Sequence, residues 1–461
     1  MTAIGIEMGP RLAGAVPPRG RYSLTQRWRQ RRERLLPMVP DRAYDDPIVT
    51  TRMLLQPVVL VSDPAAVRRV LVENVANYPK TEMERRFFVA IFGAGLLGID
   101  GDLWRAHRRV MAPAFDPRSV ASYAPAVSEA AVAFIEHWAS LGAGARVDMA
   151  EEMTDLTLRI IARTMFSSDN PELLSAIRGS LGAGSLAIGE LSFQDLLPVL
   201  RDRRMRERER MIARIFAPLD DLVHAMMAER AAKPDDQPAD LLGRLMAASD
   251  DEGGGKLSAR EVRDEVVTIF VAGHETTAMT MSWTWYLLSQ HPAWVDRLQA
   301  ELASVLGGRV AGQEDLAKLA LTRRVIDESM RLYPAAPGLS MRVALEGDTL
   351  CGQKIAKGAA IAVLPWVLHR HRALWDDPER FDPDRFLPER SAGRHRFAFM
   401  PFGGGPRVCI GQLLAVNESV LLLASLAQRF RPRLAPDAKV IPMHNVTLQP
   451  RRGLEMLLEA A

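Results

Sequence analysis

The chain has 461 residues, of which 48% are hydrophobic, and a formal net charge of +3. This length and apolar content suffice for a large buried core, and so small a net charge excludes a broad positive field for nucleic acid. Two cysteines in such a length exclude a disulfide scaffold and favour a reducing compartment.

The first predicted element is a basic N-terminal arm over residues 1–45. Arginines are frequent between Arg19 and Arg34, but the arm lacks the apolar core of about 7 to 15 residues that a signal peptide requires. We therefore expect a solvated arm. The best apolar run of the chain, residues 266–272, is far shorter than the roughly 18 to 20 residues of a membrane span. The sequence predicts a soluble protein without a membrane anchor.

A β-branched strand is predicted at residues 57–62, and residues 339–365 alternate short apolar runs with glycine-bounded turns, which is typical of further strands. Most of the remaining chain has the helical period of apolar residues. The pattern predicts a mainly α protein with a smaller β part, an α+β class.

Residues 93–98 read Gly-Ala-Gly-Leu-Leu-Gly behind a strand-like stretch at 87–92. The dinucleotide fingerprint of this form requires a helix to open at the glycines. Here Asp100-Gly101-Asp102 predicts a turn, and Pro113 interrupts the segment where a second strand should lie. The context argues against a nicotinamide dehydrogenase, the strongest competing interpretation.

Trp104 and Arg108 are four residues apart on a predicted helix, so their side chains share one face.

A longer helix is predicted further along the chain. Ser258 followed by Glu261 forms a capping box, and the helical pattern continues to about Gln290. Roughly thirty residues at 1.5 Å each give a helix of about 50 Å, long enough to cross a domain.

The middle of this helix, residues 272–277, reads Ala-Gly-His-Glu-Thr-Thr. Gly273 costs about 1 kcal/mol relative to alanine, and Thr276 can donate its hydroxyl to the carbonyl of Ala272, so we expect the helix to loosen here. His274-Glu275 is also how a zinc-protease helix begins, but Ala278 stands where the second ligand is required. By itself the stretch also fits a helix with an exposed polar patch.

Glu328 and Arg331 form a Glu-x-x-Arg pair on a helix that a proline ends at residue 334. The same spacing occurs at 82–85 and 207–210, and an exposed pair of this kind is worth only about 0.2 to 0.5 kcal/mol. The pattern alone is therefore weak.

Residues 402–411 read Phe-Gly-Gly-Gly-Pro-Arg-Val-Cys-Ile-Gly and precede a long apolar helix that starts near Ile410. The amides and the positive dipole end of that helix predict a lowered pKa for the Cys409 thiol. The four glycines leave room for a large flat ligand. A nucleophile, a metal or cluster ligand and a buried structural thiol remain open, although clusters and zinc sites need about four such ligands and only Cys351 remains.

Phe402, Gly405, Arg407, Cys409 and Gly411 together resemble the haem-binding loop of the cytochrome P-450 superfamily, a highly specific motif. The resemblance extends from about residue 58 to the C-terminus and implies one haem domain, which we place at 46–461. It implies haem b as the cofactor, with Cys409 as the axial iron ligand and Arg407 beside a haem propionate. Phe402 and Gly411 complete the loop.

The resemblance also assigns the other motifs. It implies that Thr276 holds bound dioxygen and that Glu275 resupplies its protons. Trp104 and Arg108 resemble the pair that meets the haem propionates, and Arg342 is a further candidate by its position.

Glu328 and Arg331 resemble two members of a buried Glu-Arg-Arg network. We prefer Arg385 as the third member because it lies nearer to the cysteine loop, while Arg380 remains an alternative. The apolar residues of 87–97 are expected to line the loop that covers the haem, and the pocket is expected to be closed from the opposite side by Leu186, Ile188, Leu191 and Phe193.

The sequence is thus identified as resembling a soluble, bacterial-type, cytoplasmic haem-thiolate monooxygenase that oxidises a lipophilic small molecule with dioxygen. No second domain follows Cys409, so we expect a monomer that receives electrons from a ferredoxin or flavodoxin and its NAD(P)H reductase. Arg105, His107 and Arg109 are expected to face outward and to help dock that acidic partner. The alternatives are a peroxide-driven peroxygenase and, in another class, a non-catalytic haem sensor or electron carrier.

Overall fold

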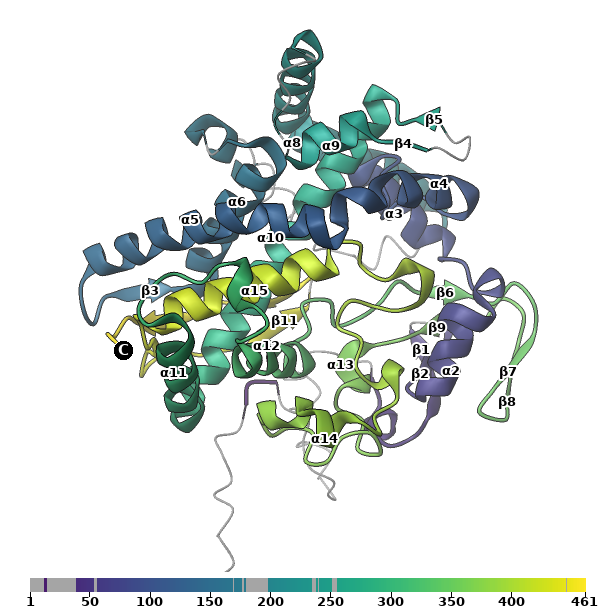
Figure 1. The fold of residues 1–461 in the computed structure, drawn as a ribbon. Coiled ribbons are helices and arrows are strands. Elements are labelled where there is room, and N and C mark those ends of the chain that lie inside the picture. The colour runs from purple at the N-terminus through teal and green to yellow at the C-terminus, as the bar shows by residue number, and fades with distance from the viewer. Residues whose placement is uncertain are drawn as a thin grey trace, which may run out of the picture.

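The computed structural model describes residues 12–14, 39–53, 56–168, 170–175, 178–179, 198–233, 238, 240–250, 255–444 and 446–461. The fold is mainly helical, as predicted (Figure 1). Its α-helices are α2 (Pro64–Arg68), α3 (Glu82–Phe92), α4 (Gly101–Met111), α5 (Pro117–Leu141), α6 (Met149–Phe166), α8 (Pro198–Ala232), α9 (Leu241–Ala247), α10 (Ala259–Gln290), α11 (Pro292–Leu306), α12 (Ala320–Leu332), α13 (Pro365–Leu368), α14 (Pro388–Ser391) and α15 (Gln412–Ala427).

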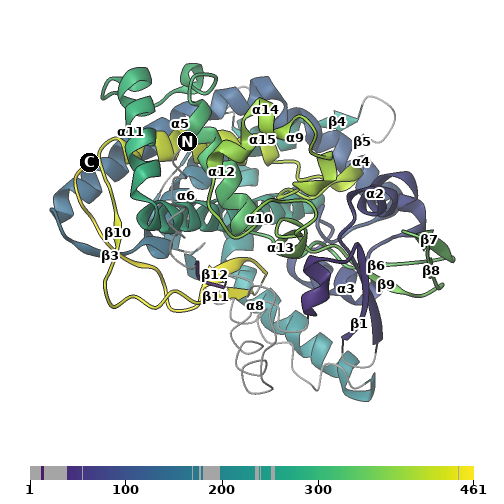
Figure 2. The ribbon, with the colours of Figure 1, turned by 90° about the horizontal axis from the view of Figure 1, so that it is seen from below.

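The strands form small separate sheets. The largest has the order β1-β2-β9-β6, and the others are β10-β13-β3, β11-β12, β4-β5 and β7-β8. Their bounds are β1 (Ile48–Met53), β2 (Gln56–Val61), β3 (Arg146–Asp148), β4 (Ser249–Asp250), β5 (Gly255–Lys256), β6 (Arg342–Val343), β7 (Asp348–Leu350), β8 (Gln353–Ile355), β9 (Ala360–Ala362), β10 (Arg433–Leu434), β11 (Pro442–His444), β12 (Leu448–Pro450) and β13 (Glu455–Leu457). The sheet that contains β1 and the sheet that contains β3 lie at opposite ends of the molecule in both ribbon views (Figure 2).

The central helix α10 has the start and end that its caps predict. The Ser258 hydroxyl accepts from the Glu261 amide, the Glu261 carboxylate accepts from the Ser258 amide, and the helix ends before His291. It packs against α6, α12 and α15 and crosses the middle of the fold (Figure 1). The expected loosening at Gly273 is wrong, because α-helical structure is continuous through it. The packed neighbours outweigh a penalty of about 1 kcal/mol.

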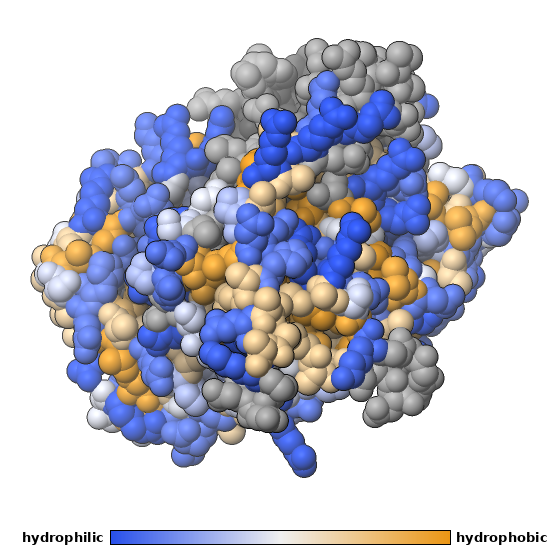
Figure 3. All heavy atoms as spheres, turned by 90° about the horizontal axis from the view of Figure 1, so that it is seen from above, coloured by the Kyte–Doolittle hydropathy of each residue, from blue (hydrophilic) through white to orange (hydrophobic). Residues whose placement is uncertain are grey.

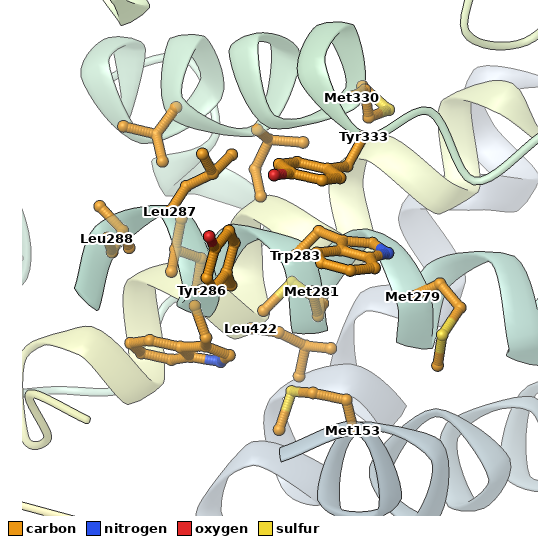
Figure 4. Close-up of a cluster of buried hydrophobic side chains, with 14 of the residues drawn as sticks. Met153, Met279, Met281, Trp283, Tyr286, Leu287, Leu288, Met330, Tyr333 and Leu422 are labelled. Carbon is orange, nitrogen blue, oxygen red and sulfur yellow. The ribbon is translucent and has the colours of Figure 1, made fainter. Parts of the chain in front are cut away.

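An aromatic group anchors the C-terminal half of α10 (Figure 4). The Trp283 indole stacks on the Tyr333 ring with centroids 4.3 Å apart and planes 5° from parallel, and Tyr286 meets both rings edge-on. All three side chains are buried. Rings at such distances stabilise the core beyond their buried area and fix α10 against α12.

The arginine-rich stretch from residue 19 to 34, on which the expectation of a solvated arm rests, lies outside the described residues. The described parts of the chain before residue 46 are in part buried. Leu12 is 4% exposed, and Val39 and Tyr44 are also buried. The Ala13 amide donates to the Tyr286 hydroxyl at 3.0 Å, and the Tyr333 hydroxyl donates to the Ala13 carbonyl at 2.7 Å. These hydrogen bonds satisfy two buried tyrosines, which composition alone does not reveal.

The described helices include none that is long and apolar enough to cross a membrane. One face of the molecule is mostly hydrophilic, with apolar residues in separate patches (Figure 3).

Candidate active site

The cysteine loop is a closed turn that contains η9 (Gly405–Arg407) and leads into α15. The Cys409 amide donates to the Phe402 carbonyl at 3.0 Å, which closes the loop across the glycines. Gly405 has φ of +71°, and a Cβ there would lie 2.2 Å from the Leu71 carbonyl oxygen. Only glycine satisfies both conditions. Gly405 therefore serves the packing of the loop against the protein, rather than the approach of a ligand as expected from the sequence.

The electrostatics of the Cys409 thiol differ from the prediction. Burial raises the pKa of this thiol, although the Gly411 amide and the Arg108 guanidinium act in the opposite direction. The prediction of a lowered pKa is wrong for the protein alone, because desolvation of a thiolate outweighs one amide and one cation. The residue is nevertheless accessible by surface area. A cation close to such a thiol would favour its thiolate form.

Trp104 and Arg108 share one face of α4, as predicted, and that face is turned to the cysteine loop. Trp104 is 8% exposed, and the Arg407 guanidinium lies 4.2 Å from its ring centroid. Arg108 is close enough to Cys409 to act on its pKa. Arg407 donates to the Asp100 carboxylate and, at 3.0 Å, to the Ile99 carbonyl. These two acceptors of Arg407 were not foreseen from the sequence.

Arg342 and Lys80 extend this group of cations. Arg342 is 8% exposed, and its Nε has no hydrogen-bond partner among the described residues. Lys80 is 7% exposed and donates to the Leu97 carbonyl at 2.5 Å. Burial, with the Arg407 charge, lowers the pKa of Lys80 to about 8. Two desolvated cations without a carboxylate in hydrogen-bonding contact indicate a site for an anion.

The residues present fit a haem. The charged groups that act on one another here are four cations, Lys80, Arg108, Arg342 and Arg407, and two carboxylates, Glu84 and Asp100. This leaves an excess of two positive charges beside the only thiol of the site. Haem brings two propionate carboxylates and an iron that binds a cysteine thiolate. Lys80, Glu84 and Asp100 have no sequence signal for this role, because only the fold brings them to α4.

His107 does not face outward. It is 2% exposed and lies 2.8 Å from Glu265 through Nδ1 and 3.3 Å from Glu261 through Nε2. These carboxylates raise the pKa of His107 despite its burial. The expectation of a docking role for His107 is therefore wrong, since it connects α4 to α10. Arg105 and Arg109 are exposed, as expected.

The Gly-x-Gly-x-x-Gly stretch is not a dinucleotide-binding fingerprint, because the residues before it form helix α3 instead of a strand. The stretch packs on α10 instead. The Ala94 amide donates to Asp264 at 2.8 Å and the Leu96 amide to Glu265 at 3.0 Å. A Cβ on Gly95 would lie 1.9 Å from the Thr268 hydroxyl oxygen. The glycines thus permit a close approach to α10, which is the physical origin of the motif here.

Thr276 and Glu275 lie in the middle of α10. The Thr276 hydroxyl donates to the Ala272 carbonyl at 2.8 Å, as predicted. The Glu275 carboxylate accepts from the Thr447 hydroxyl at 2.6 Å and from the Gln449 amide. Both partners of Glu275 come from the β11–β12 hairpin and were missed, because they lie 172 and 174 residues away in the sequence. Both side chains are half-buried, and a hydroxyl and a carboxyl are groups of the kind that take part in proton transfer.

The Glu-Arg-Arg network forms with Arg385. Glu328 and Arg331 are 0% exposed, and Arg331 donates to both carboxylate oxygens at 2.6 and 2.8 Å. Arg385 is buried with its Nε 3.4 Å from Glu328. Arg380 is exposed and contributes its carbonyl. The preference for Arg385 is confirmed.

The apolar residues expected around the site are only partly described. Phe87, Phe88, Leu96 and Leu97 are partly buried against the cluster that contains Phe92 and Phe270. Leu186, Ile188, Leu191 and Phe193, expected to form the opposite wall, lie outside the described residues.

Known proteins are similar to most of this chain in sequence and in fold. The family described as Cytochrome P450 matches residues 26–457. Cyclooctatin synthase of Streptomyces melanosporofaciens is 36% identical over 407 residues, which cover 87% of this chain and 86% of that protein. Cyclooctat-9-en-7-ol 5-monooxygenase of the same organism is 36% identical over 352 residues, 75% of this chain and 74% of its own. The crystal structure of the cytochrome P450DA heme domain matches with a TM-score of 0.78 at 28% identity over 90% of each chain.

Proposed function

The chain belongs to the cytochrome P450 family, and from its site we propose how it acts as a monooxygenase on a lipophilic small molecule. The family makes it a haem-dependent oxidoreductase. The observation that carries the proposal is the presence of an accessible cysteine on the loop before α15 together with an adjacent hydroxyl and carboxyl, Thr276 and Glu275, on α10.

We assign the cofactor contacts to residues from three parts of the chain. Cys409 would bind the haem iron, and Arg108, Arg342, Arg407 and Trp104 would hold the propionates. The Phe402 carbonyl accepts the hydrogen bond from the Cys409 amide that closes the loop, and Gly411 is the N-cap residue of α15. Both residues would thereby fix the backbone on either side of the sulfur. When bound, the haem iron with its thiolate ligand supplies the site at which dioxygen is activated.

The protein's own contribution is the handling of protons. The Thr276 hydroxyl donates to the Ala272 carbonyl and its oxygen lone pairs remain available as acceptors, so the hydroxyl can give up its proton while it accepts another. Glu275 precedes it by one residue and can refill a proton that Thr276 gives up. Reduction of one oxygen atom of dioxygen to water consumes two electrons and two protons, which is the demand that this pair meets.

The substrate is proposed from the lining and from the relatives. The partly buried Phe87, Phe88, Leu96 and Leu97 are apolar and suit a substrate with few polar groups. One relative is named for cyclooctat-9-en-7-ol, a cyclic alcohol with a largely hydrocarbon frame. We therefore assign a terpenoid as the substrate class and hydroxylation as the oxidation.

The electron donor is proposed to be a separate ferredoxin or flavodoxin with its NAD(P)H reductase. The exposed Arg105 and Arg109 flank Arg108, which acts on Cys409 from the same helix. A basic surface so close to the thiol suits an acidic partner.

The test is a panel of terpene hydrocarbons and alcohols added to the purified haem protein. A substrate is expected to shift the haem from low to high spin and to give a product with one added oxygen when ferredoxin, reductase and reduced nicotinamide are supplied. Product formed equally well from peroxide alone would favour a peroxygenase. If no panel compound shifts the spectrum or consumes electrons, the haem sensor becomes the better interpretation.

A further inference from the structure

The carboxylate of Glu275 is held by the C-terminal hairpin. Its Oε1 accepts from the Thr447 hydroxyl at 2.6 Å and from the Gln449 side-chain amide, and that amide lies 3.3 Å from the Thr447 oxygen. Thr447 is 4% exposed and Gln449 is half-buried. A buried hydroxyl and an amide thus meet on one carboxylate oxygen, and the second oxygen, Oε2, has no hydrogen bond among the described residues.

The hairpin is fixed in place by residues that do not touch Glu275. The Trp283 indole donates to the Leu448 carbonyl at 2.8 Å, and the Leu448 amide donates to the Ala335 carbonyl at 2.9 Å. Leu448 is 0% exposed. Because alternate residues of an extended chain share a face, burial of Leu448 on one side turns Thr447 and Gln449 together toward Glu275.

The chemistry of the two donors is informative because both are neutral. Elsewhere in this chain a carboxylate with a structural role, Glu328, is paired with Arg331, which would be left as a buried, unpaired charge if Glu328 took a proton. A hydroxyl can either donate or accept, so Thr447 can keep its contact with Glu275 in both protonation states. Thr447 and Gln449, together the clamp on Glu275, therefore fix the position of the carboxyl without fixing its charge.

We propose that Thr447 and Gln449 are positioning residues of the proton supply, which hold Glu275 through Oε1 and leave Oε2 to take up and release the proton. This inference rests on the proposed role of Glu275. The C-terminal hairpin is then a working part of the site, since its displacement would release the carboxyl from its place on α10.

The experiment compares Thr447→Val and Gln449→Leu with Gln428→Leu, a control that removes a half-buried glutamine amide donating at 2.8 Å to the Arg309 carbonyl. Both hairpin variants are expected to bind haem normally but to lower the product formed per electron, up to about tenfold, with peroxide as the by-product. Thr447→Ser restores the hydroxyl and is expected to restore the yield. The control is expected to match the parent protein.

A second measurement does not depend on turnover. The thermal midpoint is determined for Gln449→Leu in the parent and in a Glu275→Ala background. A direct contact predicts that the two changes are not additive and that Gln449→Leu costs less when Glu275 is absent. Additive midpoints, or hairpin variants with the yield of the control, would overturn the clamp while leaving Glu275 as the acid. An unchanged yield in Glu275→Ala alone would overturn the acid role itself, and the clamp with it.

Discussion

Thr276 and Thr277 are neighbours on α10 that make the same hydrogen bond. Each hydroxyl donates to the carbonyl four residues earlier, Thr276 to Ala272 at 2.8 Å and Thr277 to Gly273 at 3.0 Å. They differ in exposure, because Thr277 is 3% exposed whereas Thr276 is half-buried. The chain thus contains its own control for the role of one hydroxyl.

Thr276→Ala is expected to keep the haem and the fold but to divert electrons from product to peroxide, because the proton that Thr276 supplies is lost. General acid catalysis of this kind is worth about 100-fold or more, so product per electron should fall severely. The measurement is the ratio of product to reduced nicotinamide consumed.

Thr277→Ala removes an equivalent hydrogen bond to the backbone. It is expected to change stability slightly and the product formed per electron very little. An equal loss of product per electron in both variants would mean that the hydroxyls act through the helix backbone and not through proton delivery.

Cys409→Ser is expected to abolish the red-shifted Soret band of the reduced carbon monoxide complex, because that band requires a thiolate on the iron. Cys351→Ser is the matched control. Cys351 lies in the turn between β7 and β8, and burial together with Asp63 raises the pKa of its thiol to about 11, so it stays protonated at neutral pH. Retention of the band in Cys409→Ser would remove Cys409 from the iron.

The parts of the fold that follow from local signals could be predicted. The capping box of Ser258 and Glu261 and the stop at His291 depend on residues a few positions apart, and they gave the bounds of α10. The stretch 87–92 was predicted as a strand and is part of α3, because a short apolar run fits either period. A local signal was present, since the Thr81 hydroxyl accepts from the Glu84 amide at the start of this helix.

Parts of the site that depend on burial or on distant contacts could not be predicted. The direction of the Cys409 pKa required knowledge of how much protein surrounds the sulfur. The partners of Glu275, the Asp100 contact of Arg407 and the inward turn of His107 join segments more than 150 residues apart. The family motif identified the residues, and only the fold shows what each of them touches.

Glu418→Gln is expected to stabilise the protein increasingly as pH rises. Glu418 of α15 is 8% exposed, and burial raises the pKa of its carboxyl to about 8, whereas in an unfolded chain that pKa is about 4.3. Between these values the folded state holds a proton that the unfolded state has lost. Stability therefore falls with rising pH in this window, by about 1.4 kcal/mol per unit.

The variant lacks this titration, so its advantage in thermal midpoint is expected to grow from pH 5 to pH 8, corresponding to several kcal/mol, about 4 at most. Glu151→Gln, an exposed carboxylate in the first turn of α6, is the control and should show no such trend. A constant difference between Glu418→Gln and the parent across this range would mean that Glu418 is ionised in the folded protein.

Arg385→Ala and Arg380→Ala test which arginine completes the buried network around Glu328. Arg385 is 5% exposed, lies 3.4 Å from the Glu328 carboxylate and donates to the Asp377 carbonyl at 2.7 Å. Its removal leaves part of a buried negative charge without a partner, which costs about 3 to 5 kcal/mol when a pair is broken outright. Because Arg331 still pairs with Glu328 in this variant, we expect the loss of stability to lie near the lower of these two values.

Arg380→Ala is expected to cost less than about 0.5 kcal/mol, as for most exposed positions, because Arg380 contributes its carbonyl to Arg331 and that carbonyl survives the change. Thermal unfolding of the two haem proteins distinguishes them directly. Equal destabilisation would show that the side chain of Arg380 also reaches the network in solution. A stable Arg385→Ala protein would show instead that Arg331 alone neutralises Glu328, because one bidentate guanidinium satisfies both carboxylate oxygens.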